Sequence, residues 1–120
     1  MNKCLVLFTT VFLLGCAPGV EVTPSKLPDA YLNQPYEADI EIINSAVVGM
    51  SFYSEFSNSS FKLTPGVRDS GQDDYNNLTI NGLPTTLEPI AVYIAGSTYG
   101  TNFPGKEFEK EYTIEVKANK

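Results

Sequence analysis

The sequence predicts an all-β protein, an antiparallel β-sandwich of about seven strands. Three observations predict this fold class. Apolar and polar residues alternate with a period of two in residues 36–42 and again in residues 108–117. Gly, Pro and Asn recur between the apolar segments, where turns are expected. Nowhere does the sequence show the periodicity of an amphipathic helix.

Residues 17–42 predict two strands. Residues 17–35 contain several prolines, which argue against a helix, and residues 20–23 are expected to be a first edge strand. Residues 36–42 are expected to be a half-buried strand, because every second residue is apolar. The polar side of that strand is a row of solvated carboxylates, Glu37, Asp39 and Glu41.

The middle of the chain predicts two further strands and a loop. After a turn at residues 44–46, residues 47–56 are expected to form one continuous strand with Met50 among its inward residues. Residues 61–63 form a short strand that ends at Thr64-Pro65-Gly66. Residues 68–77 are polar throughout, so we expect an exposed loop there.

The C-terminal part completes the predicted sandwich. Residues 78–80 form a strand that the turn residues 81–84 end. Residues 90–95 are nearly all apolar, which predicts a central strand covered on both faces. A second long loop at 96–106 precedes the last strand, residues 108–117. Its inward residues are expected to be Tyr112, Ile114 and Val116.

The N-terminus has the layout of a signal peptide. Lys3 precedes an uncharged run, residues 4–14, that is shorter than the roughly 20 residues of a membrane-spanning helix. The run ends in Leu13-Leu14-Gly15-Cys16, which resembles the lipobox of bacterial lipoproteins. The resemblance implies that residues 1–15 are a signal peptide and that Cys16 carries diacylglycerol. The alternative is an ordinary secretory signal peptide whose cleavage site lies near a cysteine.

This interpretation divides the chain into three parts and suggests where the protein lies. Residues 1–15 are the signal peptide, 16–26 a lipidated tether and 27–120 the β-sandwich domain. Cys4 leaves with the signal peptide and Cys16 is acylated, so no disulfide is expected. Ala17 stands where an Asp favours inner-membrane retention in enterobacterial lipoproteins. We therefore expect a lipid-anchored protein on the periplasmic face of the outer membrane.

Charge and composition exclude several functions. The net charge is −6, and Lys3 leaves with the signal peptide, so the mature chain is more acidic still. Because the basic residues are few and scattered, nucleic-acid binding is excluded. The chain has no His and its mature part no free thiol, which removes the common nucleophilic triads and zinc sites. We therefore expect that this protein is not an enzyme, and that it has no catalytic residue and no cofactor beyond the lipid.

A second resemblance covers residues 27–117. Three short motifs carry it: Leu27-Pro28 followed by Asn33-Gln34-Pro35-Tyr36, then Leu63-Thr64-Pro65-Gly66-Val67, then Ile80-Asn81-Gly82-Leu83-Pro84. In order and spacing, these motifs are similar to those of bacterial immunoglobulin-like domains related to the cadherin-like dystroglycan type. The resemblance implies an immunoglobulin-like sandwich used for adhesion or binding. Asn33 stands where those domains usually have Gly, a change that Asn tolerates in the left-handed conformation. The Asp-rich strand end of their calcium-binding members is missing here.

Candidate binding residues lie in the two long loops. Residues 64–77 and 96–107 are expected to share one end of the sandwich with the turn at 44–46 and with the N-terminus. The aromatic residues there are Tyr75, Tyr99 and Phe103, which suit protein recognition. Alternatively, one or more of these rings cap the core. Calcium binding in the first loop is a weaker hypothesis, with Asp69, Asp73 and Asp74 as ligands and a purely solvated loop as its alternative.

The function that these features favour is a lipid-anchored, non-catalytic protein-binding or scaffold module. The alternative is a periplasmic inhibitor or immunity lipoprotein that blocks a hydrolase or a toxin by inserting a loop. The sequence names no partner for either function.

Overall fold

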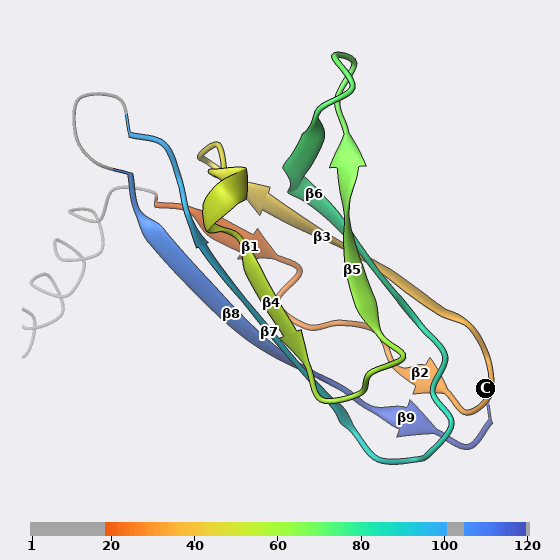
Figure 1. The fold of residues 1–120 in the computed structure, drawn as a ribbon. Coiled ribbons are helices and arrows are strands. Elements are labelled where there is room, and N and C mark those ends of the chain that lie inside the picture. Colours follow the sequence, from red (N-terminus) through yellow and green to blue (C-terminus); the bar gives the residue numbers. More distant parts are fainter. Residues whose placement is uncertain (1–18, 101–104, 120) are drawn as a thin grey trace, which may run out of the picture.

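Two antiparallel β-sheets pack face to face in the computed structural model, which describes residues 19–100 and 105–119 (Figure 1). The four-stranded sheet has the order β1 (Glu21–Thr23), β3 (Tyr36–Ile43), β6 (Asp73–Gly82), β5 (Lys62–Val67). The three-stranded sheet has the order β4 (Tyr53–Phe56), β7 (Ile90–Ser97), β8 (Glu107–Ile114). The predicted all-β sandwich is confirmed.

Without the short β2 and β9, the first, second, fifth and fourth strands of the chain form one sheet, and the third, sixth and seventh form the other. One short parallel pair is added to these two sheets. There β2 (Ala30–Tyr31) lies beside β9 (Val116–Lys117), and the Ala30 amide donates to the Glu115 carbonyl at 2.7 Å. This pair ties the segment after β1 to the C-terminal end of the chain.

The core lies between the two sheets and follows the period-two pattern of the sequence. In β3 the residues Tyr36, Ala38, Ile40 and Ile42 are buried and the three acidic residues between them are exposed, as predicted. In β8 and β9 the buried residues are Phe108, Tyr112, Ile114 and Val116, which confirms the predicted inward residues. The predicted single strand is divided in two, because β8 ends at Ile114 and β9 begins at Val116. Ile80 and Ile94 face this core from opposite sheets and are fully buried.

Pro28, Tyr36, Phe61 and Gly82 come together at one end of the sandwich. Tyr36 pairs with Gly82 across β3 and β6, and its hydroxyl donates to the Pro28 carbonyl at 2.8 Å. The Phe61 ring lies directly over Gly82, where any Cβ would overlap it, and 5.7 Å from the Tyr36 ring. Asn33 has φ of 62°, so the predicted left-handed conformation is confirmed.

The segment before residue 27 takes part in the four-stranded sheet. β1 pairs antiparallel with the end of β3, and the Asn44 side-chain amide donates to the Gly19 carbonyl at 3.1 Å. Residues 20–23 were predicted as an edge strand, and β1 at the sheet edge agrees. The described chain therefore enters at the end of the sandwich that holds the turn after β3, opposite the C-terminal end (Figure 1).

The prediction of one continuous strand over residues 47–56 is wrong. Val47 makes only an isolated bridge with Thr98, and a 3-10 turn, η1 (Gly49–Ser51), precedes β4. The Ser51 hydroxyl donates to the Val48 carbonyl at 2.7 Å and accepts from the Ser97 amide at 2.9 Å, so a side chain takes the place of ladder bonds. Met50, predicted to face inward, is 98 % exposed.

The predicted loop over residues 68–77 is also wrong. β5 continues through Thr64-Pro65-Gly66 by means of a bulge after Pro65, and β6 begins at Asp73. Only residues 68–72 turn, closed by a hydrogen bond from the Arg68 amide to the Gln72 carbonyl at 2.8 Å. The outer part of this hairpin buries little surface, so its strands carry no apolar alternation by which the sequence could reveal them.

The expectation that residues 90–95 are covered on both faces is wrong as well. Ile90, Val92 and Ile94 are buried, whereas Ala91 is exposed and Tyr93 is partly exposed. Ala and Tyr count as apolar in a pattern, yet both are tolerated at a solvated sheet position. One face of β7 is therefore open.

Two buried tyrosines predict a loss of stability in alkali. Burial raises the pKa of Tyr112 to about 12, and burial together with the Asp29 carboxylate raises that of Tyr36 to about 12. Because each phenol ionises first in the unfolded state, the stabilisation is complete below pH 10 and lost between about pH 10 and 12. The unfolding free energy should fall by up to about 1.4 kcal/mol per pH unit for each tyrosine.

Urea denaturation at pH 8, 10 and 11 measures this slope. Tyr112→Phe should reduce it, and should also cost about 1 kcal/mol at pH 8 because the hydroxyl donates to the Pro24 carbonyl at 2.6 Å. An unfolding free energy that does not change between pH 8 and 11 would contradict the prediction.

Candidate functional site

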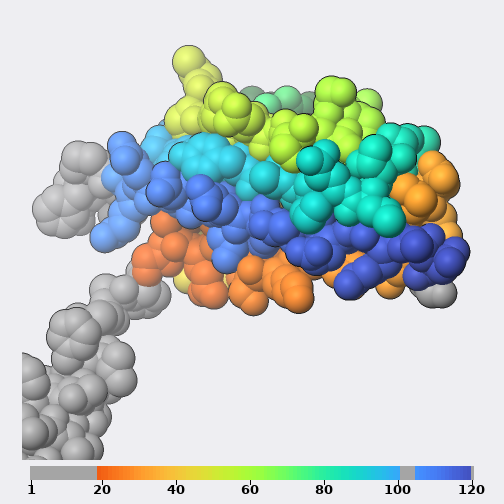
Figure 2. Space-filling model, turned by 90° about the horizontal axis from the view of Figure 1, so that it is seen from below, coloured from red at the N-terminus to blue at the C-terminus, as the bar shows by residue number. Residues whose placement is uncertain are grey.

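The outer face of the three-stranded sheet is the most distinctive surface of the described residues. We call it the tyrosine face. The strands β4, β7 and β8 lie side by side across it, in yellow-green, cyan and blue in Figure 2. Its outward-facing residues are Tyr53 and Glu55 of β4, Ala91, Tyr93 and Ala95 of β7, and Glu107, Glu109 and Glu111 of β8.

Tyr93 is the centre of this face. The strand register places it between Glu55 of β4 and Glu111 of β8. Its hydroxyl donates to Glu109 Oε2 at 2.9 Å, and this hydrogen bond is the main cause that raises the pKa of the Tyr93 phenol. The Tyr53 ring meets it edge to face, with centroids 6.1 Å apart. The phenol ring is thus held in place while it remains open to solvent.

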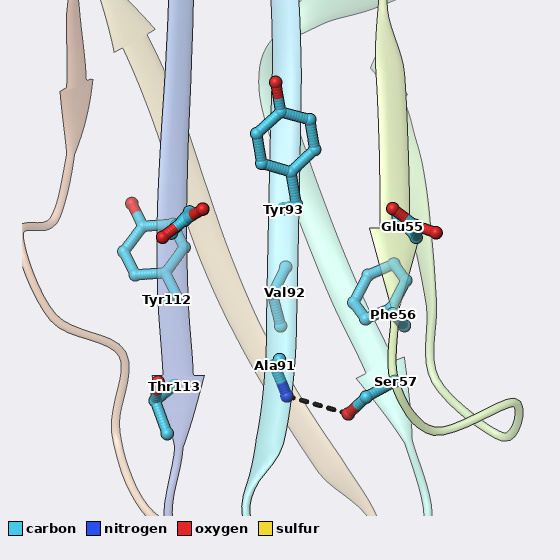
Figure 3. Close-up of a pocket in the computed structure, with 9 residues that line it drawn as sticks. Glu55, Phe56, Ser57, Ala91, Val92, Tyr93, Tyr112 and Thr113 are labelled. Carbon is cyan, nitrogen blue, oxygen red and sulfur yellow. Dashed lines mark hydrogen bonds between the residues drawn. The ribbon is translucent and has the colours of Figure 1, made fainter.

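The face is hollowed on both sides of Tyr93. One hollow, of about 350 Å³, lies over Ala91 beside Glu55 and Tyr93 (Figure 3). Glu111 of β8 also lines it. Beneath it, the Ala91 amide donates to Ser57 Oγ at 2.9 Å, which fixes the end of β4 against β7. The other hollow, of about 590 Å³, lies over Ala95 and Gly96 and is bordered by Glu107 and Glu109. Small residues of β7 form both floors and acidic residues line both walls.

The outer face of the four-stranded sheet has a different character. Glu37, Asp39 and Glu41 of β3 are exposed there, and across the strands their neighbours are the polar residues of β6. The Thr79 hydroxyl donates to Asp39 Oδ1 at 3.1 Å. No outward position of β3 or β6 in the described structure holds an aromatic ring, so this face resembles an ordinary solvated surface.

Of the predicted binding aromatics, Tyr75 packs against the core and Tyr99 is exposed. Tyr75 lies in β6, not in a loop, and its ring packs 5.2 Å from the Phe52 ring and against Gly49. It therefore covers the edge of the core, the alternative that the sequence left open. Tyr99 is 64 % exposed, with its amide donating to the Ala46 carbonyl at 2.9 Å. Both tyrosines line an open depression of about 450 Å³ that also includes Arg68.

Two predicted residues lie outside the described part of the chain. These are Cys16, the predicted lipid attachment residue, and Phe103, the third predicted binding aromatic. Their roles stay predictions.

The three acidic residues considered for calcium lie in two different parts of the hairpin. Asp69 lies in the turn, and Asp73 and Asp74 lie in β6. The Asp74 carboxylate accepts from Asn77 Nδ2 at 2.8 Å and from the Asn76 amide at 2.9 Å, and the first of these bonds is the main cause that lowers its pKa. Within residues 19–100 and 105–119, no three acidic side chains come together as a potential metal site.

We therefore expect calcium to leave the fold unchanged. The melting temperature should be the same, within about 1 °C, in millimolar calcium and in chelator, because a ligand stabilises only the state that binds it. Differential scanning fluorimetry measures this. A rise of several degrees that Asp73→Asn abolishes would contradict the expectation.

The chain matches no protein-family model, no curated protein and no solved structure. Of the described residues, none belongs to a helix long and apolar enough to cross a membrane.

The sequence did not reveal the tyrosine face, although a signal was present. Residues 90–95 were interpreted as covered on both sides, which hid Tyr93 among core residues. In residues 107–113 every second residue is charged or polar, and that row marks an exposed side. An open β8 beside β7 implies that β7 is open on the same side.

Proposed function

We propose that this protein is a lipid-anchored bacterial envelope lipoprotein whose immunoglobulin-like sandwich is a non-catalytic protein-binding module. The observation that carries the proposal is the tyrosine face, an open sheet surface with two ordered rings and a hollow on each side of one of them. Tyr rings give a large contact area at a low entropy cost, and they are enriched at the energetic centres of protein interfaces.

The predicted anchor supports a defined orientation. Only Ala17 and Pro18 separate Cys16 from Gly19, whose carbonyl is hydrogen-bonded to Asn44. A lipid on Cys16 would then lie within roughly 11 Å of Gly19. The end of the sandwich at the turn after β3 is thus the membrane-proximal end. The tyrosine face lies along the side of the sandwich and is open to partners in the periplasm.

The anchor and the binding face are tested with separate variants. Cys16→Ala should move the protein from the membrane fraction to the soluble fraction and abolish incorporation of a palmitate analogue. Unchanged fractionation would contradict the anchor. Tyr53→Ala combined with Tyr93→Ala should remove the dominant partner that wild-type protein captures from envelope extracts.

A matched control guards against nonspecific effects. Glu37→Gln combined with Glu41→Gln changes the opposite sheet face and should leave the captured partner in place. Capture that survives loss of both tyrosines would contradict the assignment of the binding face.

A further inference from the structure

We propose that the tyrosine face binds an extended, basic segment of a partner protein, with two Arg or Lys side chains that occupy the hollows on either side of Tyr93. The inference rests on the proposed protein-binding function and adds the chemistry of the partner. It depends on three features of the face: its charge, the spacing of its hollows and the position of the Tyr93 ring.

The charge of the face selects a cationic partner. Glu107, Glu109 and Glu111 follow one another on the same side of β8, about 7 Å apart. The only basic residue of β8, Lys110, points to the other side, where its ammonium lies 5.2 Å from the centroid of the Tyr112 ring. Like charges at this spacing repel, and cations from a partner would remove that repulsion.

The same charges exclude other occupants. Two copies of this chain, each with a net charge of −6, would bring rows of carboxylates together if they met through this face. Phosphate groups of nucleic acids or anionic lipids would be repelled in the same way. An extended segment with positive side chains is the occupant that the face fits.

The two hollows set the spacing of the basic residues. Their floors are centred on Ala91 and Ala95, four residues apart on β7, which corresponds to about 13 Å. An extended segment parallel to β7 would place side chains at positions i and i+4 into the two hollows. Each hollow offers carboxylates for the charged head and a wall of the Tyr93 ring for the aliphatic stem.

The position of Tyr93 suits this contact. Its hydroxyl is already bonded to Glu109, so the ring is held in place beside both hollows with one face open on the outer side of the sheet (Figure 3). A guanidinium beside a tyrosine ring and a carboxylate gains both a cation–π contact and a charge-assisted hydrogen bond. Arg is expected to bind more tightly than Lys, because its planar group makes both contacts at once.

Peptide binding to the full lipidated protein in nonionic detergent micelles tests the inference. The probe is a fluorescein-labelled, Thr- and Ser-rich ten-residue peptide with Arg at positions 3 and 7, followed by fluorescence anisotropy. We expect saturable binding that weakens as salt is raised. Peptides with Glu at the same two positions should not bind, and peptides with Arg at positions 3 and 5 should bind more weakly.

Two double variants of equal charge give the decisive comparison. Glu107→Gln with Glu111→Gln removes one charge from each hollow and should weaken binding roughly three- to tenfold. Glu37→Gln with Glu41→Gln removes the same charge from β3 and should leave the dissociation constant unchanged. Equal weakening by both variants would show a nonspecific charge effect and overturn the inference, as would binding of the Glu peptide or no binding of the Arg peptide at millimolar concentration.

Failure of this inference is distinguishable from failure of the proposed function. If partner capture depends on Tyr53 and Tyr93 but no Arg peptide binds, the protein-binding function stands and the basic segment is wrong. If the partner is still captured when both tyrosines are replaced, the function proposed for this face is wrong.

Discussion

Replacing Asn76 with aspartate is expected to destabilise the protein by about 2–4 kcal/mol at neutral pH. The Asn76 side-chain amide donates to the Ile42 and Ser45 carbonyls, both at 2.7 Å. Its Oδ1 accepts from the Val47 amide at 3.0 Å. One side chain from β6 thus satisfies three backbone groups, one at the end of β3 and two in the segment that follows it. A carboxylate would keep the third bond but set a charged oxygen against two carbonyl oxygens.

The pH dependence of this variant identifies the cause. Protonation restores one donor to the introduced carboxyl group, so the difference from wild type should shrink as the pH falls toward 4. Asn77→Asp is the control, because Asn77 is exposed and its side chain bonds only the Asp74 carboxylate; it should cost less than about 1 kcal/mol. Urea denaturation measures both. A difference below 0.5 kcal/mol for Asn76→Asp, as an approximate limit, would contradict this account of the turn.

Replacing Ile94 with alanine should cost about 2–5 kcal/mol of unfolding free energy. Ile94 is fully buried on the inner side of β7. Its two neighbours in the strand, Tyr93 and Ala95, lie on the open side. Removal of three carbon atoms loses their transfer free energy and leaves a cavity that the β-sandwich cannot easily close. A large loss is expected because the core depends on the packing of two short sheets, whose described residues include no cysteine.

Two further substitutions in β7 separate packing from surface effects. Ile94→Val should cost about 0.5–1.5 kcal/mol, since it removes one carbon atom. Ala95→Ser, one residue on and on the open face, should change stability by less than about 0.5 kcal/mol. Equal costs for Ile94→Ala and Ala95→Ser would contradict the assignment of the two faces of β7.

The parts of the fold that the sequence predicted are those in which one strand face is buried and the other solvated. The alternation of β3 and of β8 with β9 identified both their existence and their inward residues. The alternation failed where a side chain replaces the hydrogen bonds between strands, as Ser51 does before β4. It also failed where strands extend beyond the core, as in the outer hairpin of β5 and β6. Neither situation leaves a period-two pattern in the sequence.

The candidate site was harder to predict, because it depends on the register between strands. Tyr53, Tyr93 and Glu109 are far apart in the sequence, and nothing in a single segment shows that they meet. The sequence pointed instead to loop aromatics, of which Tyr75 packs against Phe52 and Tyr99 is exposed. The resemblance to a lipobox is local to Leu13-Leu14-Gly15-Cys16, which lies outside the described residues, so the anchor stays a prediction.

In-cell photocrosslinking from position 93 tests the central claim most directly. A photoreactive amino acid at position 93, in the chain with Cys16 intact, should capture one dominant protein that contains a basic segment. The same amino acid at position 39, on the opposite sheet face, should not capture it. Capture of a hydrolase or toxin from position 99, with nothing specific from position 93, would contradict the account and favour an inhibitor that acts through its loops.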